Sequence, residues 1–162
     1  MVELMIGIAI LAILSAVAVP SFQSWLQNSQ IRNAAESILN GLQRARAEAV
    51  GRNINVEFVV SPDSSWVVRV ASGVEIESRS SGEGSKDVTI TMIPNGTNTV
   101  TYNNFGGIQA TNLDTSAPFN RIDADSSSMP TSESQDLRIT IGLGGNVKLC
   151  DPNAPSGSAR AC

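Results

Sequence analysis

The sequence predicts an α+β protein: a long N-terminal helix, hydrophobic in its first half and amphipathic in its second, packed on an antiparallel β-sheet domain. Residues 4–26 carry no charged side chain, and an apolar stripe at helical spacing follows them without a break. From Asn53 onward the apolar period shortens from that of a helix to that of a strand. We therefore divide the chain into a membrane or filament-core helix (residues 1–26), an amphipathic continuation of that helix (27–52) and a β-rich globular domain (53–162).

The apolar first half of the helix has the length of a membrane span. At ~1.5 Å per residue, residues 4–26 can cross the ~30 Å hydrocarbon core of a bilayer. The segment has no basic region in front of it and is longer than the apolar core of a signal peptide, so we expect a retained helix. Pro20 removes one backbone hydrogen bond, which predicts a kink or local opening over residues 16–20.

Glu3 stands directly in front of this uncharged segment. A carboxylate at that depth is costly in lipid unless a positive group pairs with it, and this demand makes Glu3 a candidate assembly residue. The alternative is an interfacial carboxylate that is stabilised by the dipole at the helix N-terminus.

The second half of the helix is amphipathic, with one apolar stripe that a soluble domain can cover. Its spacing alternates between four and three residues, which keeps every member on one face of a helix. Gly51 is the expected helix stop. The stripe consists of Ile31, Ala35, Ile38, Leu42, Ala45 and Ala49.

Short strands separated by turn residues follow the helix and predict antiparallel hairpins rather than a parallel fold. Several of these segments alternate strictly between apolar and polar positions. The Ser-, Thr- and Asp-rich stretch Asp114–Asp136 is expected to be a long surface loop, with room for one brief strand at Phe119–Ala124. The predicted strands are Asn55–Val60, Trp66–Ala71, Val74–Arg79, Val88–Ile93, Thr99–Asn103, Gly107–Thr111, Leu137–Ile141 and Asn146–Cys150.

Composition argues against most enzyme classes. The chain has no histidine, which removes Ser-His triads, the commonest general base and most catalytic zinc sites. The sequence also lacks a nucleophile elbow and a metal-binding motif, so we expect no enzymatic activity, no cofactor and no metal. A formal net charge of −4 argues against bulk electrostatic attraction to nucleic acid.

The chain has two cysteines, Cys150 and Cys162. A disulfide between them would close a short loop at the C-terminus and suits an oxidising compartment. Such a bond contributes roughly 2–4 kcal/mol of stability and holds a tail that would otherwise fray. The alternative is a pair of buried free thiols.

The N-terminal sequence MVELMIGIAILAILSAVAVPSF resembles the start of type IV pilins and type II secretion pseudopilins. Those chains carry a glutamate at the fifth position after an N-methylated first residue, and the spacing from Glu3 to Pro20 fits their pattern. The resemblance therefore implies that two mature residues and a basic leader, removed by prepilin peptidase, precede Met1.

Further segments are similar to one branch of this superfamily, the GspH/FimT/FimU-type minor pilins. The helix ends in the Ala-Arg-x-Glu-Ala motif of that branch. In VTYNNFGGIQ, Gly106 and Gly107 occupy a Gly-Arg turn without its arginine, and in LRITIGLGGNVKLC, Gly145 and Cys150 align. The residues that match the helix motif are Ala45, Arg46, Glu48 and Ala49.

The resemblance implies a minor pilin, a structural subunit that primes, caps or enters a type IV pilus or type II secretion pseudopilus. It implies a pilin-like fold and a single span in the inner membrane, with a cytoplasmic N-terminus and a periplasmic β-domain, before transfer into the pilus, which can extend outside the cell. The implied partners are other pilin subunits through helix–helix packing, the prepilin peptidase and the assembly platform. Glu3 would neutralise the N-terminal amine of a neighbouring subunit and set register during assembly.

Two alternatives stay open. The chain could be a major pilin that forms the filament itself. It could also be a DNA-binding tip pilin for natural transformation, because Gly157 and Arg160 occupy two positions of the Gly-Arg-x-Arg motif of FimT-type pilins, with Ser158 in place of the first arginine. Lys148 and Arg160 are then the candidate DNA contacts. A single arginine without an aromatic neighbour binds nucleic acid weakly, so we favour a structural role for the terminal loop.

Overall fold

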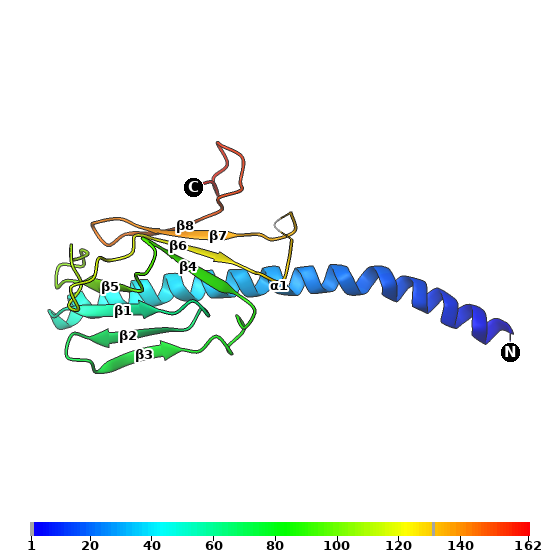
Figure 1. Cartoon of the computed structure of the whole chain (residues 1–162), viewed down its shortest axis with the longest axis horizontal. Helices are drawn as coiled ribbons and strands as arrows, with labels where there is room; N and C mark the ends of the chain where they lie inside the picture. The colour runs from blue at the N-terminus through cyan, green and yellow to red at the C-terminus, as the bar shows by residue number, and fades with distance from the viewer. Residues whose placement is uncertain (1, 131) are drawn as a thin grey trace.

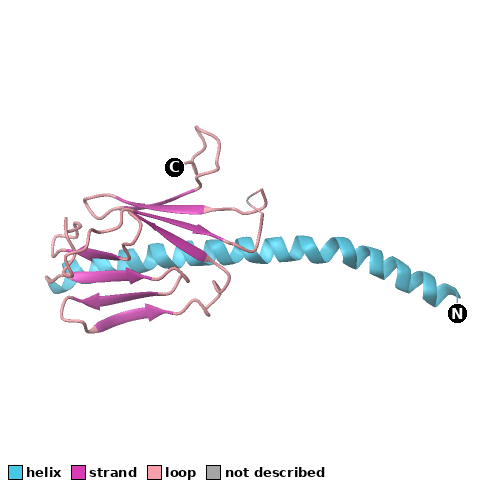
Figure 2. Ribbon diagram, in the orientation of Figure 1, coloured by secondary structure: helices cyan, strands magenta, loops and turns pink. Residues whose placement is uncertain are grey.

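The computed structural model shows one long helix, α1 (Val2–Arg52), and two antiparallel four-stranded sheets that pack against its second half (Figures 1 and 2). It describes residues 2–130 and 132–162, and all their side chains except that of residue 17. Met1 and Thr131, which fall in the predicted membrane segment and the predicted surface loop, lie outside the described residues. The α+β fold class predicted from the sequence is confirmed.

The two sheets do not divide at one point of the chain, because β5 joins the sheet of β1 to β3, whereas β4, which precedes it, joins the sheet of β6 to β8. One sheet has the order β3-β2-β1-β5 and the other has the order β4-β6-β7-β8. The strands of the first sheet are β1 (Val56–Val60), β2 (Trp66–Val70), β3 (Glu75–Arg79) and β5 (Thr99–Tyr102). Those of the second are β4 (Thr89–Ile93), β6 (Arg121–Asp125), β7 (Leu137–Ile141) and β8 (Val147–Cys150).

The surface loop predicted over Asp114–Asp136 is interrupted by an interior strand. β6 pairs with β4 on one side and with β7 on the other, near the brief strand allowed at Phe119–Ala124. Its apolar residues Ile122 and Ala124 are fully buried, whereas the charged residues that alternate with them are partly exposed. The polar outer face of β6 therefore concealed a core strand in a sequence rich in Ser, Thr and Asp.

The strand predicted at Gly107–Thr111 is wrong. This segment forms only an isolated bridge, between Tyr102 and Ile108. Gly106 has a φ of 78°, and its N–H donates to the carbonyl of Asn103 at 2.9 Å, so the chain reverses in a tight turn and then leaves the sheet.

The helix ends at Arg52, the expected bound of its amphipathic half, but Gly51 is not the residue that stops it. Gly51 is still helical, and Asn53 takes the left-handed conformation at φ 56° that glycine or asparagine supplies after a helix. The N–H of Ile54 then donates to the carbonyl of Ala49 at 3.2 Å. Asn53, and not Gly51, is therefore the residue that stops the helix.

The apolar stripe of the amphipathic half is confirmed as the centre of the core. All six of its members are completely buried between the two sheets. Gly41 lies beside this stripe, and a Cβ there would come within 2.6 Å of the Phe58 ring, so glycine permits close packing of helix on sheet. The Trp66 indole N–H donates to the Ser37 hydroxyl at 2.8 Å, which satisfies its polar edge.

The loop between β6 and β7 binds the helix where the covered part of α1 begins (Figure 1). Ser24 donates its hydroxyl to the Glu133 carboxylate at 2.9 Å, and the Asn28 amide donates to the Glu133 carbonyl at 3.0 Å. The N–H of Gln135 donates back to the Asn28 side chain at 2.9 Å. These contacts attach the end of the β-domain that faces the bare half of α1 to residues 24–28 of the helix.

Candidate assembly surface

The first half of α1 projects from the β-domain as a bare apolar helix (Figure 1). Its large side chains are exposed, as Ile13 at 68 % and Phe22 at 60 % illustrate. By length and composition the helix can cross a membrane. Soluble monomers rarely expose a continuous apolar surface of this size, which marks the bare half of α1 as a candidate surface for association.

Glu3 lies in the first turn of this helix and is exposed. The structure shows no hydrogen bond or ion pair between its side chain and the described residues. Its carboxylate is therefore available to a partner, and its role in assembly stays a prediction.

Pro20 lies inside a continuous helix, because α1 runs from Val2 to Arg52. Figure 1 shows α1 curving along its bare half. The Ser24 hydroxyl lies 3.3 Å from the Pro20 carbonyl oxygen, but its shorter hydrogen bond is the one to the Glu133 carboxylate. The kink or opening at residues 16–20 stays a prediction.

At the opposite end of the molecule, Arg46 of α1 ties two turns of the β-domain together. Its Nε donates to the carbonyl of Gly106 at 3.0 Å, and its Nη2 donates to the carbonyl of Gly144 at 3.2 Å. A Cβ on Gly145 would come within 1.9 Å of the Gly106 carbonyl oxygen, so only glycine allows the turns to touch. Arg46, Gly106 and Gly145, from the three segments that carry the family resemblance, therefore meet in one place. Their spacing along the sequence did not indicate this contact.

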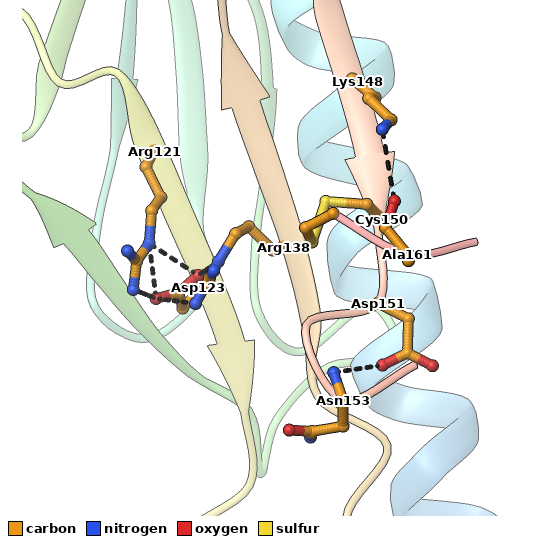
Figure 3. Close-up of a disulfide and its surroundings, with 9 residues drawn as sticks. Arg121, Asp123, Arg138, Lys148, Cys150, Asp151, Asn153 and Ala161 are labelled. Atoms are coloured by element: carbon orange, nitrogen blue, oxygen red, sulfur yellow. Dashed lines mark hydrogen bonds and ion pairs between the residues drawn. A yellow bond between two sulfur atoms is a disulfide. The ribbon is translucent and has the colours of Figure 1, made fainter. Parts of the chain in front are cut away.

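The C-terminal loop is closed by the predicted disulfide, Cys150–Cys162, which is confirmed (Figure 3). Two contacts fix the backbone beside it. The N–H of Asp151 donates to the carbonyl of Arg160 at 2.7 Å, and the Lys148 ammonium donates to the carbonyl of Ala161 at 3.3 Å. Of the two candidate DNA contacts, Lys148 is thus engaged within the chain, whereas the Arg160 side chain is exposed.

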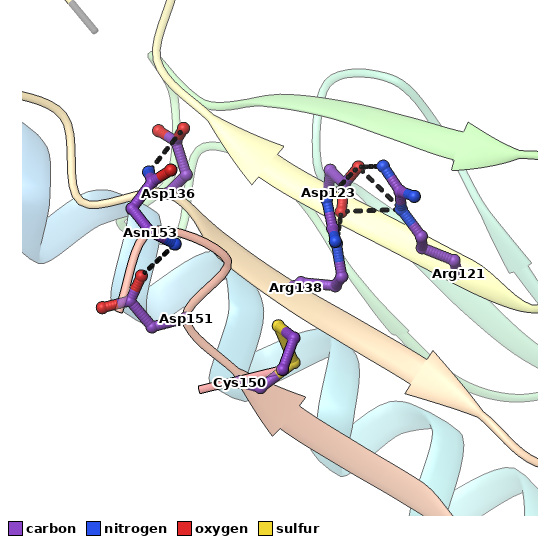
Figure 4. A network of polar contacts seen from close by, with 8 residues as sticks. Arg121, Asp123, Asp136, Arg138, Cys150, Asp151 and Asn153 are labelled. Carbon is purple, nitrogen blue, oxygen red and sulfur yellow. Dashed lines mark hydrogen bonds and ion pairs between the residues drawn. A yellow bond between two sulfur atoms is a disulfide. The ribbon is translucent and has the colours of Figure 1, made fainter. Parts of the chain in front are cut away.

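Sequence reasoning missed a charged cluster on the outer face of the second sheet. Asp123 of β6 accepts hydrogen bonds from Arg121 on the same strand and from Arg138 of β7, at 2.6 Å for the Arg138 Nε (Figure 4). Partial burial would raise the pKa of Asp123, but the two guanidinium groups lower it below its usual range. The only sequence signal was the polar alternation of β6 itself.

The described residues contain no cluster of three or more His, Cys, Asp or Glu side chains placed to hold a metal. Many of the charged side chains form ion pairs within the chain, as Asp123 does with Arg121 and Arg138. The exposed apolar half of α1 is the feature of the described structure that points to association.

Comparison with known proteins identifies similar sequences and folds. A family model described as type II transport protein GspH matches residues 34–145. The fold is similar to the type IV minor pilin FimU of Pseudomonas aeruginosa, at 16 % identity and a TM-score of 0.54 over 78 % of this chain and 94 % of that one. It is also similar to the minor pseudopilin EpsH of the Vibrio cholerae type 2 secretion system, at 11 % identity and a TM-score of 0.54 over 77 % and 99 %. With the family match covering most of the chain, the protein belongs to the GspH family.

Proposed function

We propose that this chain is a minor pilin or pseudopilin that enters a filament through the bare half of α1. The observation that carries the proposal is an uncharged helix of membrane length, whose large apolar side chains are exposed wherever they are described, attached to a folded β-domain. A span that only anchors a protein needs lipid around it at all times. A subunit that leaves the membrane must exchange lipid for neighbouring helices, and small side chains such as Gly7, Ala9 and Ala12 allow the close approach this exchange requires.

The subunit is held first in the inner membrane, with residues 1–26 in the bilayer and residues 53–162 on the periplasmic side. The Cys150–Cys162 disulfide supports this orientation, because such bonds persist in oxidising compartments. Prepilin peptidase and the assembly platform act on the cytoplasmic and membrane side of the same helix.

Glu3 supplies the pairing that drives transfer between membrane and filament. Its exposed carboxylate and the N-terminal amine of a neighbouring subunit lie at similar depth in the bilayer. Each charge is costly when buried without a partner, and the pair removes both costs at once. The interaction also sets the axial register of one helix against the next.

Replacement of the carboxylate tests this proposal. We expect Glu3→Gln to leave the chain in the membrane fraction, because the apolar segment is unchanged. Its content in purified filaments should fall about tenfold, which corresponds to the loss of ~1.4 kcal/mol of pairing free energy. Asp87→Asn is the matched control, since it removes one exposed carboxylate from the β-domain and should incorporate normally. Normal incorporation of Glu3→Gln would refute the pairing role.

A further inference from the structure

A cleft of ≈ 250 Å³ lies between α1, the neighbouring strands β7 and β8, and the C-terminal loop. Apolar side chains of the two strands form part of its wall, and charged and amide side chains form the rest. The polar residues are Asn28, Arg32, Glu36, Gln135, Asp151 and Arg160.

The two arginines of this cleft are free to bind a ligand. Among the described residues, Arg32 and Arg160 are the arginines whose side chains make no hydrogen bond or ion pair within the chain. The other arginines are engaged, as Arg46 is with two carbonyls and Arg138 is with Asp123. The backbone of Arg160 is fixed by its hydrogen bond with Asp151 and by the disulfide, so its guanidinium is not carried on a loose tail.

The cleft lies beside the part of α1 that should stand just outside the membrane, because Asn28 and Arg32 line it. A span that begins near Leu4 fills the hydrocarbon core with about 20 residues, which brings its end close to Trp25. Trp25 is 64 % exposed, as expected of an aromatic side chain at the interface. A second depression, lined by Trp25, Asn28, Ser29, Arg32 and Gln135, shares three of its residues with the cleft and continues it down to this level.

Arg32 lies about two helical turns above Trp25, or ~10 Å along the axis. Side chains on a helix lean toward its N-terminus, which here is the membrane side, and a long arginine reaches several ångströms further in that direction. The guanidinium of Arg32 therefore falls at the depth of lipid headgroups, a layer of about 5–7 Å on each side of the hydrocarbon core.

The lining of the cleft carries both signs of charge, since Glu36 and Asp151 accompany the two arginines. A simple anion would be attracted by one pair and repelled by the other. We propose that the cleft binds the headgroup of a phosphoethanolamine lipid, with its phosphodiester between Arg32 and Arg160 and its primary ammonium toward Glu36 and Asp151. The inference rests on the membrane anchoring in the proposed function, and gives the unassembled subunit a specific lipid contact.

Native mass spectrometry of the full chain, released from nanodiscs of defined composition, tests the assignment. In phosphatidylcholine discs with an equal minor fraction of phosphatidylethanolamine and phosphatidylglycerol, the wild type should retain one phosphatidylethanolamine in preference to either other lipid. Arg32→Gln and Arg160→Gln should each weaken retention about tenfold, because each removes a charge-assisted hydrogen bond to phosphate.

Lys86→Gln is the matched control. Lys86 is exposed and does not line the cleft. Its loop contacts α1 two residues before Arg32, because the Asp87 N–H donates a hydrogen bond of 3.1 Å to the Gln30 side chain. Lys86→Gln should retain lipid as the wild type does. Glu36→Gln tests the acidic side and should abolish the preference for phosphatidylethanolamine over phosphatidylglycerol.

Several outcomes would overturn the inference. If the wild type retained phosphatidylethanolamine and phosphatidylglycerol equally, the cleft would not recognise the ammonium group. If both arginine variants retained lipid as the wild type does, the lipid would not bind in this cleft. Equally tight binding of glycerophosphoethanolamine without a bilayer would assign the cleft to a free phosphodiester, and tighter binding of a short DNA duplex would assign it to nucleic acid. A chain that fails to insert into nanodiscs would refute the proposed membrane anchoring itself, whereas insertion without lipid retention refutes only this inference.

Discussion

Tyr102 buries a phenol hydroxyl that meets no hydrogen-bond partner among the described residues. Its side chain belongs to the centre of the core, at the end of β5. Burial raises its pKa well above the usual value, although the positive charge of Arg46 acts in the opposite direction. A buried hydroxyl without a partner costs free energy that a phenyl ring of the same shape does not.

Tyr102→Phe should therefore stabilise the protein by about 1 kcal/mol. Guanidinium unfolding of the full chain in non-ionic detergent, followed by the fluorescence of buried Trp66, measures the difference. Tyr102→Leu is the control for packing, because it removes the hydroxyl but leaves a cavity, and it should destabilise. If Tyr102→Phe were less stable than the wild type, the buried hydroxyl would contribute to stability, contrary to this expectation.

Asp123 is a residue whose charge state should affect the stability of the β-domain. Its pKa in the folded protein lies below the ordinary value of 3.8, so the ionised form stabilises the fold. That contribution is present above the ordinary pKa and is lost as pH falls through the lower folded pKa. Because the pair is partly exposed, we expect it to contribute about 1 kcal/mol.

Asp123→Asn should consequently unfold more easily by about 1 kcal/mol at neutral pH, and the difference from wild type should shrink toward zero as the pH falls below 3.8. Unfolding midpoints across this pH range measure the effect. Asp87→Asn, in an exposed loop, should show no such convergence. A difference that is as large in acid as at pH 7 would show that packing, and not charge, is responsible.

At the scale of elements, the contact between the two turns that Arg46 binds should tolerate a side chain at residue 144 but not at residue 145. Gly145 has a φ of 77° and no room for a Cβ, whereas the nearest atom to a Cβ on Gly144 is 3.9 Å away. Gly145→Ala should destabilise by more than about 2 kcal/mol, and Gly144→Ala by less than about 0.5 kcal/mol. Equal stability of the two variants in the same unfolding experiment would contradict the contact between the turns.

The C-terminal loop should depend on its disulfide. Cys162→Ser opens a loop closed by two cysteines that are 12 positions apart, and it should lower stability by about 2–3 kcal/mol. Reductant should destabilise the wild type to a similar degree and leave the variant unchanged. If reductant had no effect on the wild type, the bond would not stabilise the fold.

The helix and most strands were predictable from the sequence, because periodicity is a local property. The apolar stripe and the alternation of β1, β2 and β7 each indicated the element and its buried face. β6 was harder to see because its outer face carries Arg121 and Asp123, which resemble loop residues until Arg138 is placed beside them. Gly107–Thr111 alternates like a strand, but a turn removes it from the sheet.

The candidate sites divide in the same way. Glu3 and the cysteines were visible from composition and position along the chain. The contact of Arg46 with the Gly106 and Gly144 turns, and the cleft that joins Arg32 to Arg160, bring together residues far apart in sequence. Such proximity depends on the order of strands in the two sheets, which spacing along one sequence does not encode.

At the scale of the whole molecule, the protein consists of a compact β-domain and a bare apolar helix of comparable length (Figure 1). The β-domain packs on the amphipathic half of the same helix, and α1 continues without a break into the bare half. This continuity suits a subunit whose position in an assembly is set by its helix. The lipid cleft, if occupied before assembly, would hold the same unit at a defined height in the membrane.

We propose that this chain enters a filament as a minor subunit. Absolute quantification of its peptides in purified pili or pseudopili by mass spectrometry tests this role. We expect the chain to be present in the filament, at a small fraction of the principal subunit. Detection only in the membrane fraction, or as the most abundant filament subunit, would contradict it.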